Sequence, residues 1–297
     1  MIADKFREIS PHLVENESMA KHTTFKIGGN ADMFISIKSV GELQSLVKLA
    51  NETKTPFTVI GNGSNILCGD KGVRGLVIEV GTGLNACSVC ENTIYAQAGI
   101  LLSKLSAIAL AEELTGLEEV SGIPGTLGGA IFMNAGAYGG EIKTAVKNVT
   151  YVDNKGDIHT VSKNECNFGY RQSIFTDGDK YIVSAELELK NGDKDTIYEK
   201  MADYTKRRRE KQPLAYPSAG STFKRPEGYF AGALIEQSGL KGYRSGGAMV
   251  SDLHAGFVIN CGGASYSDVM NVIRHVQKTV YDKFGVELEP EVRILGE

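Results

Sequence analysis

The chain has 297 residues, and 32 Lys and Arg residues against 36 Asp and Glu residues give it a net charge of -4. A chain of this length buries about three quarters of its unfolded surface, which predicts a substantial core in one large domain or in two to three ordinary ones. The acidic balance excludes a global basic field, and no apolar run approaches the roughly 18 residues of a membrane span, so we expect neither a nucleic-acid nor a membrane partner.

The N-terminal residues and the cysteines bear on the cellular compartment. The first 14 residues mix charged and apolar side chains and lack the apolar core of a signal peptide. The five cysteines are an odd and sparse set for a disulfide framework, which favours reduced thiols. We therefore expect a cytoplasmic protein.

The first third of the chain has the pattern of a β-α-β unit. Residues 31–38 alternate apolar and polar side chains, as a half-buried strand does. Ser39 and Glu42 form a capping-box pattern ahead of apolar residues at helical spacing, which predicts a helix. Residues 57–60 and 76–80 predict two further strands.

Glycine is the one outlier in the composition, with 35 residues, about 12% against a usual 7%. The excess is concentrated in residues 61–65 and in residues 116–140, where eight glycines occur. Glycine costs about 1 kcal/mol in a helix interior, so we expect residues 116–140 to be an ordered loop assembly. Consecutive small residues can also form anion-binding backbone nests, and two nests would suit a diphosphate. A plain turn and a large structural loop are the alternatives.

The middle of the chain is predicted to be rich in strands, and a charged helix ends it. The pattern predicts a strand at 94–98, a helix at about 101–114, a hairpin of 149–152 with 158–161, and a long strand at 181–190. A helix at about 195–211 is followed by Pro213 and Pro217, which indicates a domain junction.

The last third is predicted to contain both helices and strands. We expect a short helix near 229–238, a strand at 256–260, an amphipathic helix with apolar residues from 269 to 284, and a closing strand at 288–295. Alternation in that closing strand would put Glu289, Glu291 and Arg293 on one face.

The common nucleotide and metalloprotease motifs are missing from the sequence. Cys87 and Cys90 have C-x-x-C spacing, but no second pair completes a zinc site, and chance spacing on a strand is favoured. The five histidines show no ligand spacing, so no metal is predicted. The basic run Arg207 to Arg209 is interpreted as a solvated helix end.

Three further residues could carry chemistry, but each of them, taken alone, has a simpler interpretation. Arg171 could bind a carboxylate or stabilise an enolate, but alone it would more often be a surface ion pair. Ser221 follows Gly220 and could donate a proton, although a turn serine is the simpler reading. Glu291 is most simply an edge-strand charge.

Seven motifs in chain order carry a family resemblance: residues 23–29 (TTFKIGG), 61–65 (GNGSN), 122–126 (GIPGT), 134–136 (NAG), Tyr170-Arg171, Gly220-Ser221 and 289–292 (EPEV). Together they closely resemble the UDP-N-acetylenolpyruvoylglucosamine reductases over nearly the whole chain. Any one motif would be weak, whereas seven at compatible spacing are highly specific. The compact stretch 220–291 is similar to the shorter subclass, which lacks a tyrosine-bearing loop.

The resemblance implies an α+β fold, in which a two-lobed FAD-binding domain of the vanillyl-alcohol-oxidase (PCMH) type precedes a C-terminal α+β substrate domain. The implied divisions are residues 1–85 and 86–212 for the two FAD-binding lobes and 213–297 for the substrate domain. The last strand could pack back on the FAD lobes.

The resemblance also implies the site residues. The implied contacts of a non-covalent FAD are Gly61, Asn62, Gly63, Ser64, Asn65, Gly122, Ile123, Pro124, Gly125, Thr126, Gly128, Gly129 and Asn134. The implied substrate contacts are Tyr170, Arg171 and Gly220. The implied catalytic residues are Arg171 and Glu291, which stabilise an enolate intermediate, and Ser221, which donates the proton.

The implied reaction is the reduction of UDP-N-acetylglucosamine enolpyruvate to UDP-N-acetylmuramate, in peptidoglycan precursor synthesis, with NADPH as hydride donor. The partners are then small molecules. Another FAD-dependent oxidase of the same fold is an alternative, which would react quickly with oxygen. A non-enzymatic nucleotide-binding protein is a further alternative, and it need not be yellow.

Overall fold

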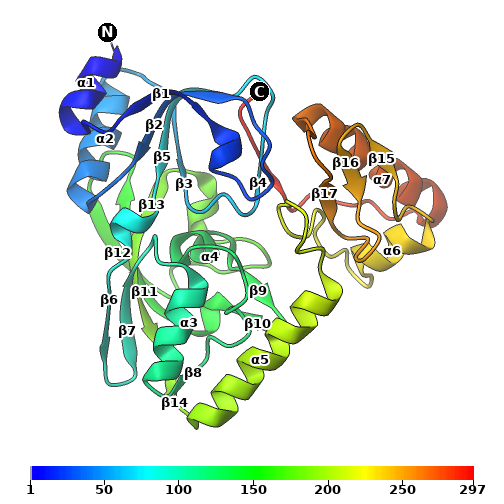
Figure 1. The fold of residues 1–297 in the computed structure, drawn as a ribbon. Helices are drawn as coiled ribbons and strands as arrows, with labels where there is room; N and C mark the ends of the chain where they lie inside the picture. The colour runs from blue at the N-terminus through cyan, green and yellow to red at the C-terminus, as the bar shows by residue number, and fades with distance from the viewer. Residues whose placement is uncertain (1) are drawn as a thin grey trace. The chain divides into compact units, whose positions relative to one another are not determined.

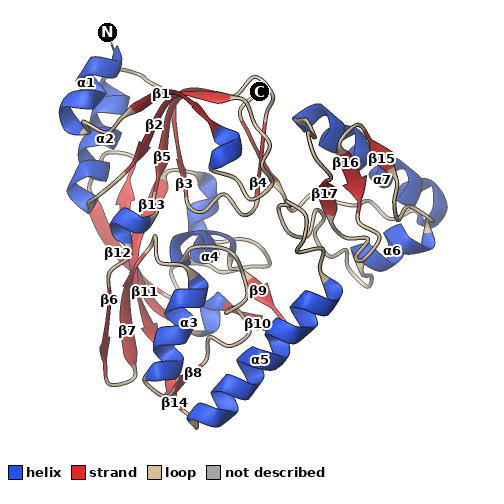
Figure 2. Ribbon diagram, in the orientation of Figure 1, coloured by secondary structure: helices blue, strands red, loops and turns tan. Residues whose placement is uncertain are grey.

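The computed structural model describes residues 2–297, which divide into two compact units built from non-consecutive segments. The first unit comprises residues up to Glu15, Met33–Asn62 and Gly75–Arg207, and the second comprises Asn16–Asp32, Gly63–Arg74 and Arg208–Glu297. Helices and strands are mixed in each unit (Figure 1, Figure 2), which confirms the α+β class. The division into residues 1–85, 86–212 and 213–297 stays a prediction.

A four-stranded sheet contains the predicted β-α-β elements. Its order is β1-β2-β5-β3, with β1 at Val14–Ser18, β2 at Asn30–Ser36, β3 at Phe57–Ile60 and β5 at Val73–Glu79. Helix α2 (Val40–Glu52) connects β2 to β3, and β3 pairs with β5 in parallel. The Ser39 hydroxyl accepts a hydrogen bond from the Glu42 amide, which confirms the helix start.

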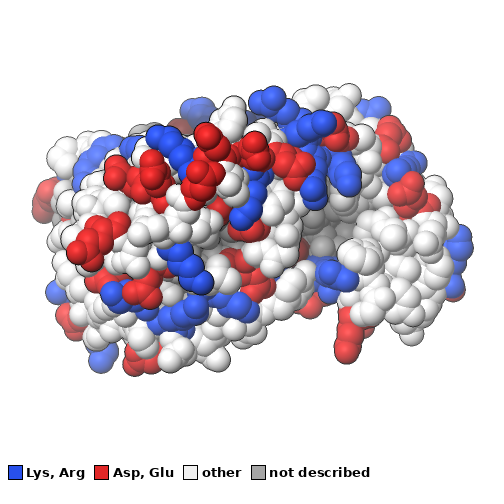
Figure 3. All heavy atoms as spheres, turned by 90° about the horizontal axis from the view of Figure 1, so that it is seen from below, with Lys and Arg blue, Asp and Glu red and all other residues white. Residues whose placement is uncertain are grey.

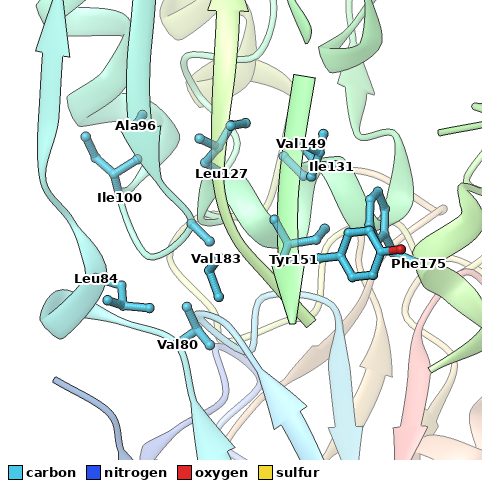
Figure 4. Packing of buried hydrophobic residues seen from close by; sticks show 14 of the residues in the cluster. Val80, Leu84, Ala96, Ile100, Leu127, Ile131, Val149, Tyr151, Phe175 and Val183 are labelled. Carbon is cyan, nitrogen blue, oxygen red and sulfur yellow. The ribbon is translucent and has the colours of Figure 1, made fainter. Parts of the chain in front are cut away.

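A five-stranded antiparallel sheet forms the middle of the first unit. Its order is β12-β11-β13-β7-β6, with β6 at Cys87–Cys90, β7 at Thr93–Gln97, β11 at Val146–Asp153, β12 at Ile158–Ser162 and β13 at Lys180–Glu188. The predicted hairpin and long strand are therefore confirmed. Apolar residues on this sheet and its neighbours form the core shown in Figure 4, where Leu127, Ile131, Val149 and Val183 are among the labelled side chains.

Helix α3 is shorter than predicted and ends at the start of a small sheet. It spans Leu102–Ala111. Residues Leu114–Thr115 form β8, which pairs with β14 (Lys190–Asn191) in an antiparallel ladder. The backbone at Leu114 is thus committed to a strand and cannot continue the helix.

The prediction that residues 116–140 contain no helix is wrong. Helix α4 spans Leu127–Met133 and includes two of the glycines. Leu127, Ala130 and Ile131 are buried, and burial of such side chains is worth about 1.5–3 kcal/mol each for the larger ones, which offsets the glycine cost. A Cβ on Gly128 would lie 2.9 Å from the Ala98 Cβ, so close packing demands glycine there.

The remaining elements of the first unit are short, apart from α5. They are α1 (Ile2–Ile9), β9 (Gly136–Ala137), β10 (Gly140–Glu141), 3-10 turns at Thr82–Leu84, Ile142–Thr144 and Ile174–Asp177, and helix α5 (Lys194–Lys211), which crosses into the second unit. Helix α5 confirms the predicted charged helix.

The second unit is built around its longest helix. Helix α7 (Tyr266–Phe284) packs against α6 (Ala231–Gln237) and against a sheet of order β15-β16-β17, with strands at Arg244–Ser245, Ala248–Val250 and Val258–Asn260. The apolar face of α7, from Val269 to Val280, is buried as predicted. This unit also holds a 3-10 turn at Met19–Lys21.

The closing strand is shorter than predicted. Only Arg293–Leu295 forms strand β18, which pairs in parallel with β4 (Ile66–Cys68). Glu289 and Glu291 precede this strand, so strand alternation does not put them on one face with Arg293. Instead, Pro290 forms an isolated antiparallel bridge with Phe223.

Within the described residues, no helix is long and apolar enough to cross a membrane. Lys and Arg side chains are interspersed with Asp and Glu over the face drawn in Figure 3, consistent with the net charge of -4.

Candidate functional site

Two glycine-rich segments that lie far apart in the sequence meet in the first unit. The Asn62 side-chain amide donates a hydrogen bond of 2.7 Å to the Pro124 carbonyl. A Cβ on Gly61 would lie 2.6 Å from the Thr126 hydroxyl oxygen. The predicted nests are therefore neighbours at this point, and only glycine allows the approach at position 61.

The loop from Gly63 to Asn65 belongs to the second unit. Gly63 has a φ of 60°, and a Cβ there would lie 2.0 Å from the His22 carbonyl oxygen. The Gly63 carbonyl accepts a hydrogen bond from the Thr24 amide. The TTFKIGG motif and the GNGSN motif thus contact one another, while Ser64 and Asn65 are half-buried.

Helix α4 continues the second glycine segment. Thr126 is buried and its hydroxyl caps the helix by accepting from the Gly129 amide. A Cβ on Gly129 would meet only that hydroxyl, at 3.5 Å, and Gly129 is exposed. Small residues and open space beside two touching loops fit a flat cofactor that approaches the backbone closely, so the residues present fit FAD.

Arg171 lies in a tight turn. The Gly169 amide donates to the Gln172 carbonyl, and these two residues form an isolated antiparallel bridge. Arg171 has a φ of 56°, in the left-handed region that is uncommon for a residue with a side chain. Its guanidinium donates to the Gly136 carbonyl at 3.2 Å and lies 5.1 Å from the Tyr170 ring centroid.

Two residues that sequence reasoning did not single out support this turn. The Ser173 hydroxyl donates to the Phe132 carbonyl at 2.7 Å. Glu141 pairs with Lys143 at 2.6 Å and accepts from the Asn134 amide at 3.1 Å. Burial opposes the charge of Glu141, but hydrogen bonds from Lys143 and Asn134 and the charges of Lys143 and Arg171 hold its pKa below the ordinary value. No sequence pattern distinguishes Ser173, because its partner Phe132 lies 41 positions away in the chain, and Glu141 belongs to no recognised motif.

Ser221 and Glu291 are brought together in the second unit. The Glu291 amide donates to the carbonyl of Thr222, the residue after Ser221, at 2.8 Å. The Asn65 side-chain amide donates to the Glu291 carbonyl at 3.0 Å. Ser221 is exposed and Glu291 is half-buried.

The loop that carries Ser221 is anchored on both sides. Thr222 donates its amide to the Gly256 carbonyl, and its hydroxyl accepts from the Val258 amide. Gly220 has a φ of 75°, which glycine adopts without strain. The candidate catalytic residues are thus divided between the units, with Arg171 in the first and Ser221 and Glu291 in the second.

Two of the cysteines and one of the histidines are buried in ways that disfavour their charged forms. All five cysteines are free, and burial raises the pKa of Cys68 and of Cys166 to about 11, so neither is a reactive thiolate at neutral pH. Burial likewise lowers the pKa of His254. No group of three potential metal-ligating side chains occurs among residues 2–297.

Family models match both parts of the chain. Residues 31–162 match the FAD binding domain, and residues 212–295 match the C-terminal domain of UDP-N-acetylenolpyruvoylglucosamine reductase. The fold and the glycine-lined site therefore define the class as a flavoprotein oxidoreductase.

Full-length relatives narrow the class. The chain is 49% identical to the UDP-N-acetylenolpyruvoylglucosamine reductase of Caldanaerobacter subterraneus subsp. tengcongensis over 100% of this chain and 99% of that protein. It is 49% identical to the reductase of Clostridioides difficile, over 95% and 93% of the two chains. The crystal structure of the reductase from Thermus caldophilus matches with a TM-score of 0.81 and 34% identity over 96% of this chain and 98% of that one. The chain belongs to the UDP-N-acetylenolpyruvoylglucosamine reductase family.

Proposed function

We propose that this protein reduces UDP-N-acetylglucosamine enolpyruvate to UDP-N-acetylmuramate, with NADPH as hydride donor and FAD as cofactor. The observation that carries the proposal is the 49% identity to a named reductase over 100% of this chain. This reaction would take place in the bacterial cytoplasm, as a step of peptidoglycan precursor synthesis.

The cofactor, when bound, carries two electrons from NADPH to the substrate. The glycine-rich segments supply its binding surface: Gly61, Asn62, Gly63, Ser64, Asn65, Gly122, Ile123, Pro124, Gly125, Thr126, Gly128 and Gly129. Their backbone groups and small side chains suit a diphosphate and a flat ring system. Asn134, which the resemblance also implies as a cofactor contact, is left out of this surface because its side chain is fully buried.

Arg171 is assigned to the carboxylate of the substrate. Hydride addition to the methylene carbon of an enolpyruvyl ether puts negative charge on the neighbouring carbon, and the conjugated carboxylate takes up that charge. A guanidinium aimed at the carboxylate stabilises it by a few kcal/mol. The left-handed backbone of Arg171 supports this role, because strain of this kind persists where the surroundings fix a side chain for function. Tyr170 and Gly220 complete the proposed substrate contacts.

Ser221 is assigned as the proton donor to carbon, and Glu291 as a partner that stabilises the enolate. Serine is a weak acid, which suits protonation of a strongly basic carbon. The hydrogen bond between the Glu291 amide and the Thr222 carbonyl supports a joint role for Ser221 and Glu291, because it holds Glu291 beside the residue that follows Ser221.

An anaerobic two-step experiment tests this function. The purified protein is titrated with NADPH while the flavin spectrum is followed, and UDP-N-acetylglucosamine enolpyruvate is then added. We expect the flavin to bleach and then recover. Recovery with oxygen alone would indicate an oxidase, and a colourless protein that cannot take up FAD would overturn the flavoenzyme assignment.

A further inference from the structure

The end of helix α4 contacts the Arg171 turn at two points. Asn134, the residue that ends the helix, donates a side-chain hydrogen bond of 2.8 Å to the Gly169 carbonyl. The Ser173 hydroxyl donates back to the carbonyl of Phe132, in the last turn of the helix. Gly169 and Ser173 flank the turn, so α4 holds it on both sides.

Asn134 also contacts the other segment that Arg171 touches. Its amide donates to Glu141 Oε2 at 3.1 Å, and its Oδ1 accepts from the Lys143 amide at 3.3 Å. Glu141 lies in β10, which pairs with β9, and Gly136 in β9 accepts the hydrogen bond of the Arg171 guanidinium. One side chain thus connects the turn and the hairpin that together surround Arg171.

The side chain of Asn134 has no donor left for another molecule. An amide has two N–H donors, and both are used within the first unit, on Gly169 and Glu141. The residue is fully buried, with an exposed fraction of 0%. Its backbone has a φ of 45° and a ψ of 55°, a left-handed conformation that asparagine tolerates better than most residues. Asparagine is therefore required twice, for its backbone and for its amide.

We propose that Asn134 is a positioning residue, which sets the place of the Arg171 guanidinium by joining the turn 169–172 to the hairpin 136–141, and that its side chain does not bind the cofactor. This inference rests on the proposed function, because it takes Arg171 to act on the substrate. A displacement of about 1 Å in a catalytic group costs up to roughly 100-fold in rate, so loosening the turn affects the chemistry of the substrate step.

Asn134→Gly is the informative variant, because glycine keeps the left-handed backbone and removes only the amide. We expect it to slow reoxidation of the reduced flavin by substrate roughly 10- to 100-fold. Flavin content, the flavin spectrum and the rate of reduction by NADPH should match the unmodified protein. Loss of flavin, or equal slowing of both half-reactions, would overturn the proposal and indicate a direct contact with the cofactor.

Comparison with Arg171→Ala tests whether Asn134 acts through the arginine. In the double variant, Asn134→Gly should add no further slowing to that of Arg171→Ala, because there is no guanidinium left to position. Multiplying effects would overturn the inference. If Arg171→Ala alone reoxidises at the normal rate, the proposed role of Arg171 fails. If Arg171→Ala is slow but Asn134→Gly reoxidises at the normal rate, only the inference about Asn134 fails.

Two further variants guard the interpretation. Glu113→Gly is the matched control, since Glu113 also has a left-handed backbone after a helix, with a φ of 57°, and is exposed; both half-reactions should be normal. If Asn134→Gly does not fold, Ser173→Ala removes the second anchor of the turn and should give the same selective slowing. Normal reoxidation in folded Ser173→Ala would then count against the inference.

Discussion

The turn that carries Arg171 and the segments that carry Ser221 and Glu291 are held in different ways. The Asn134 amide and the Ser173 hydroxyl attach the Arg171 turn to helix α4, and a backbone hydrogen bond between Gly169 and Gln172 closes the turn itself. Backbone hydrogen bonds hold Ser221 near Glu291, and the side chains of Asn65 and Thr222 assist. Backbone hydrogen bonds remain after most side-chain substitutions, whereas a single substitution removes a side-chain hydrogen bond. Arg171 should therefore be the more easily displaced of the candidate catalytic residues.

The largest effect should come from Ser221, the proposed proton donor. Ser221→Ala removes a hydroxyl but leaves the backbone pairing intact, so it should slow flavin reoxidation by substrate about 10²- to 10⁴-fold. Stopped-flow absorbance of each half-reaction measures this, and reduction by NADPH should be nearly unchanged. Ser45→Ala, at an exposed position of α2, is the control. Equal loss in both half-reactions would remove Ser221 from the proposed role.

Arg171→Lys should come next, at roughly 10- to 100-fold in the same half-reaction. Lysine keeps the charge but cannot reproduce the planar fork at a carboxylate. The measurement is the same stopped-flow assay, with Arg207→Lys as a control, because Arg207 forms an exposed ion pair with Asp203. Near-normal turnover would count against bidentate binding.

Asn65→Ala tests the side-chain contact in the other region. It removes the hydrogen bond to the Glu291 carbonyl, so the free energy of unfolding of the holoprotein should fall by about 1 kcal/mol. Urea unfolding measures the change, and Asn164→Ala, in an exposed loop, is the control. No loss of stability would mean that backbone pairing alone holds Glu291.

The smallest effect is a pH dependence near Arg171. The pKa of Glu141 in the folded protein lies below its ordinary value of 4.5. The ionised carboxylate therefore stabilises the fold above about pH 4.5, and this stabilisation is lost as the pH falls through the folded pKa. Glu141→Gln should flatten the stability profile over that acidic range, as measured by thermal unfolding. Parallel profiles for Glu141→Gln and the unmodified protein would contradict this prediction.

Local patterns predicted most of the fold. The alternating strand at 31–38, the helix after Ser39, the hairpin over 149–161 and the amphipathic face of α7 all depend on residues close together in the chain, and each is confirmed. Helix α4 was missed because its buried contacts come from distant segments, among them Ala98 next to Gly128. The closing strand was predicted to begin at residue 288, but it begins at Arg293. Its start could not be predicted from local patterns, because its partner, β4, is far away in the sequence.

The sequence by itself determined the family, through seven ordered motifs, and the resemblance implies Arg171, Ser221 and Glu291 as the candidate catalytic residues. Only the tertiary structure decided which of those motifs touch: Gly61 and Asn62 with residues 124–126, Asn65 with Glu291, and Asn134 with the Arg171 turn. The physical reason is that motif residues are recognised by type and order along the chain. Hydrogen bonds between residues 35 or 226 positions apart form only when the intervening chain has folded.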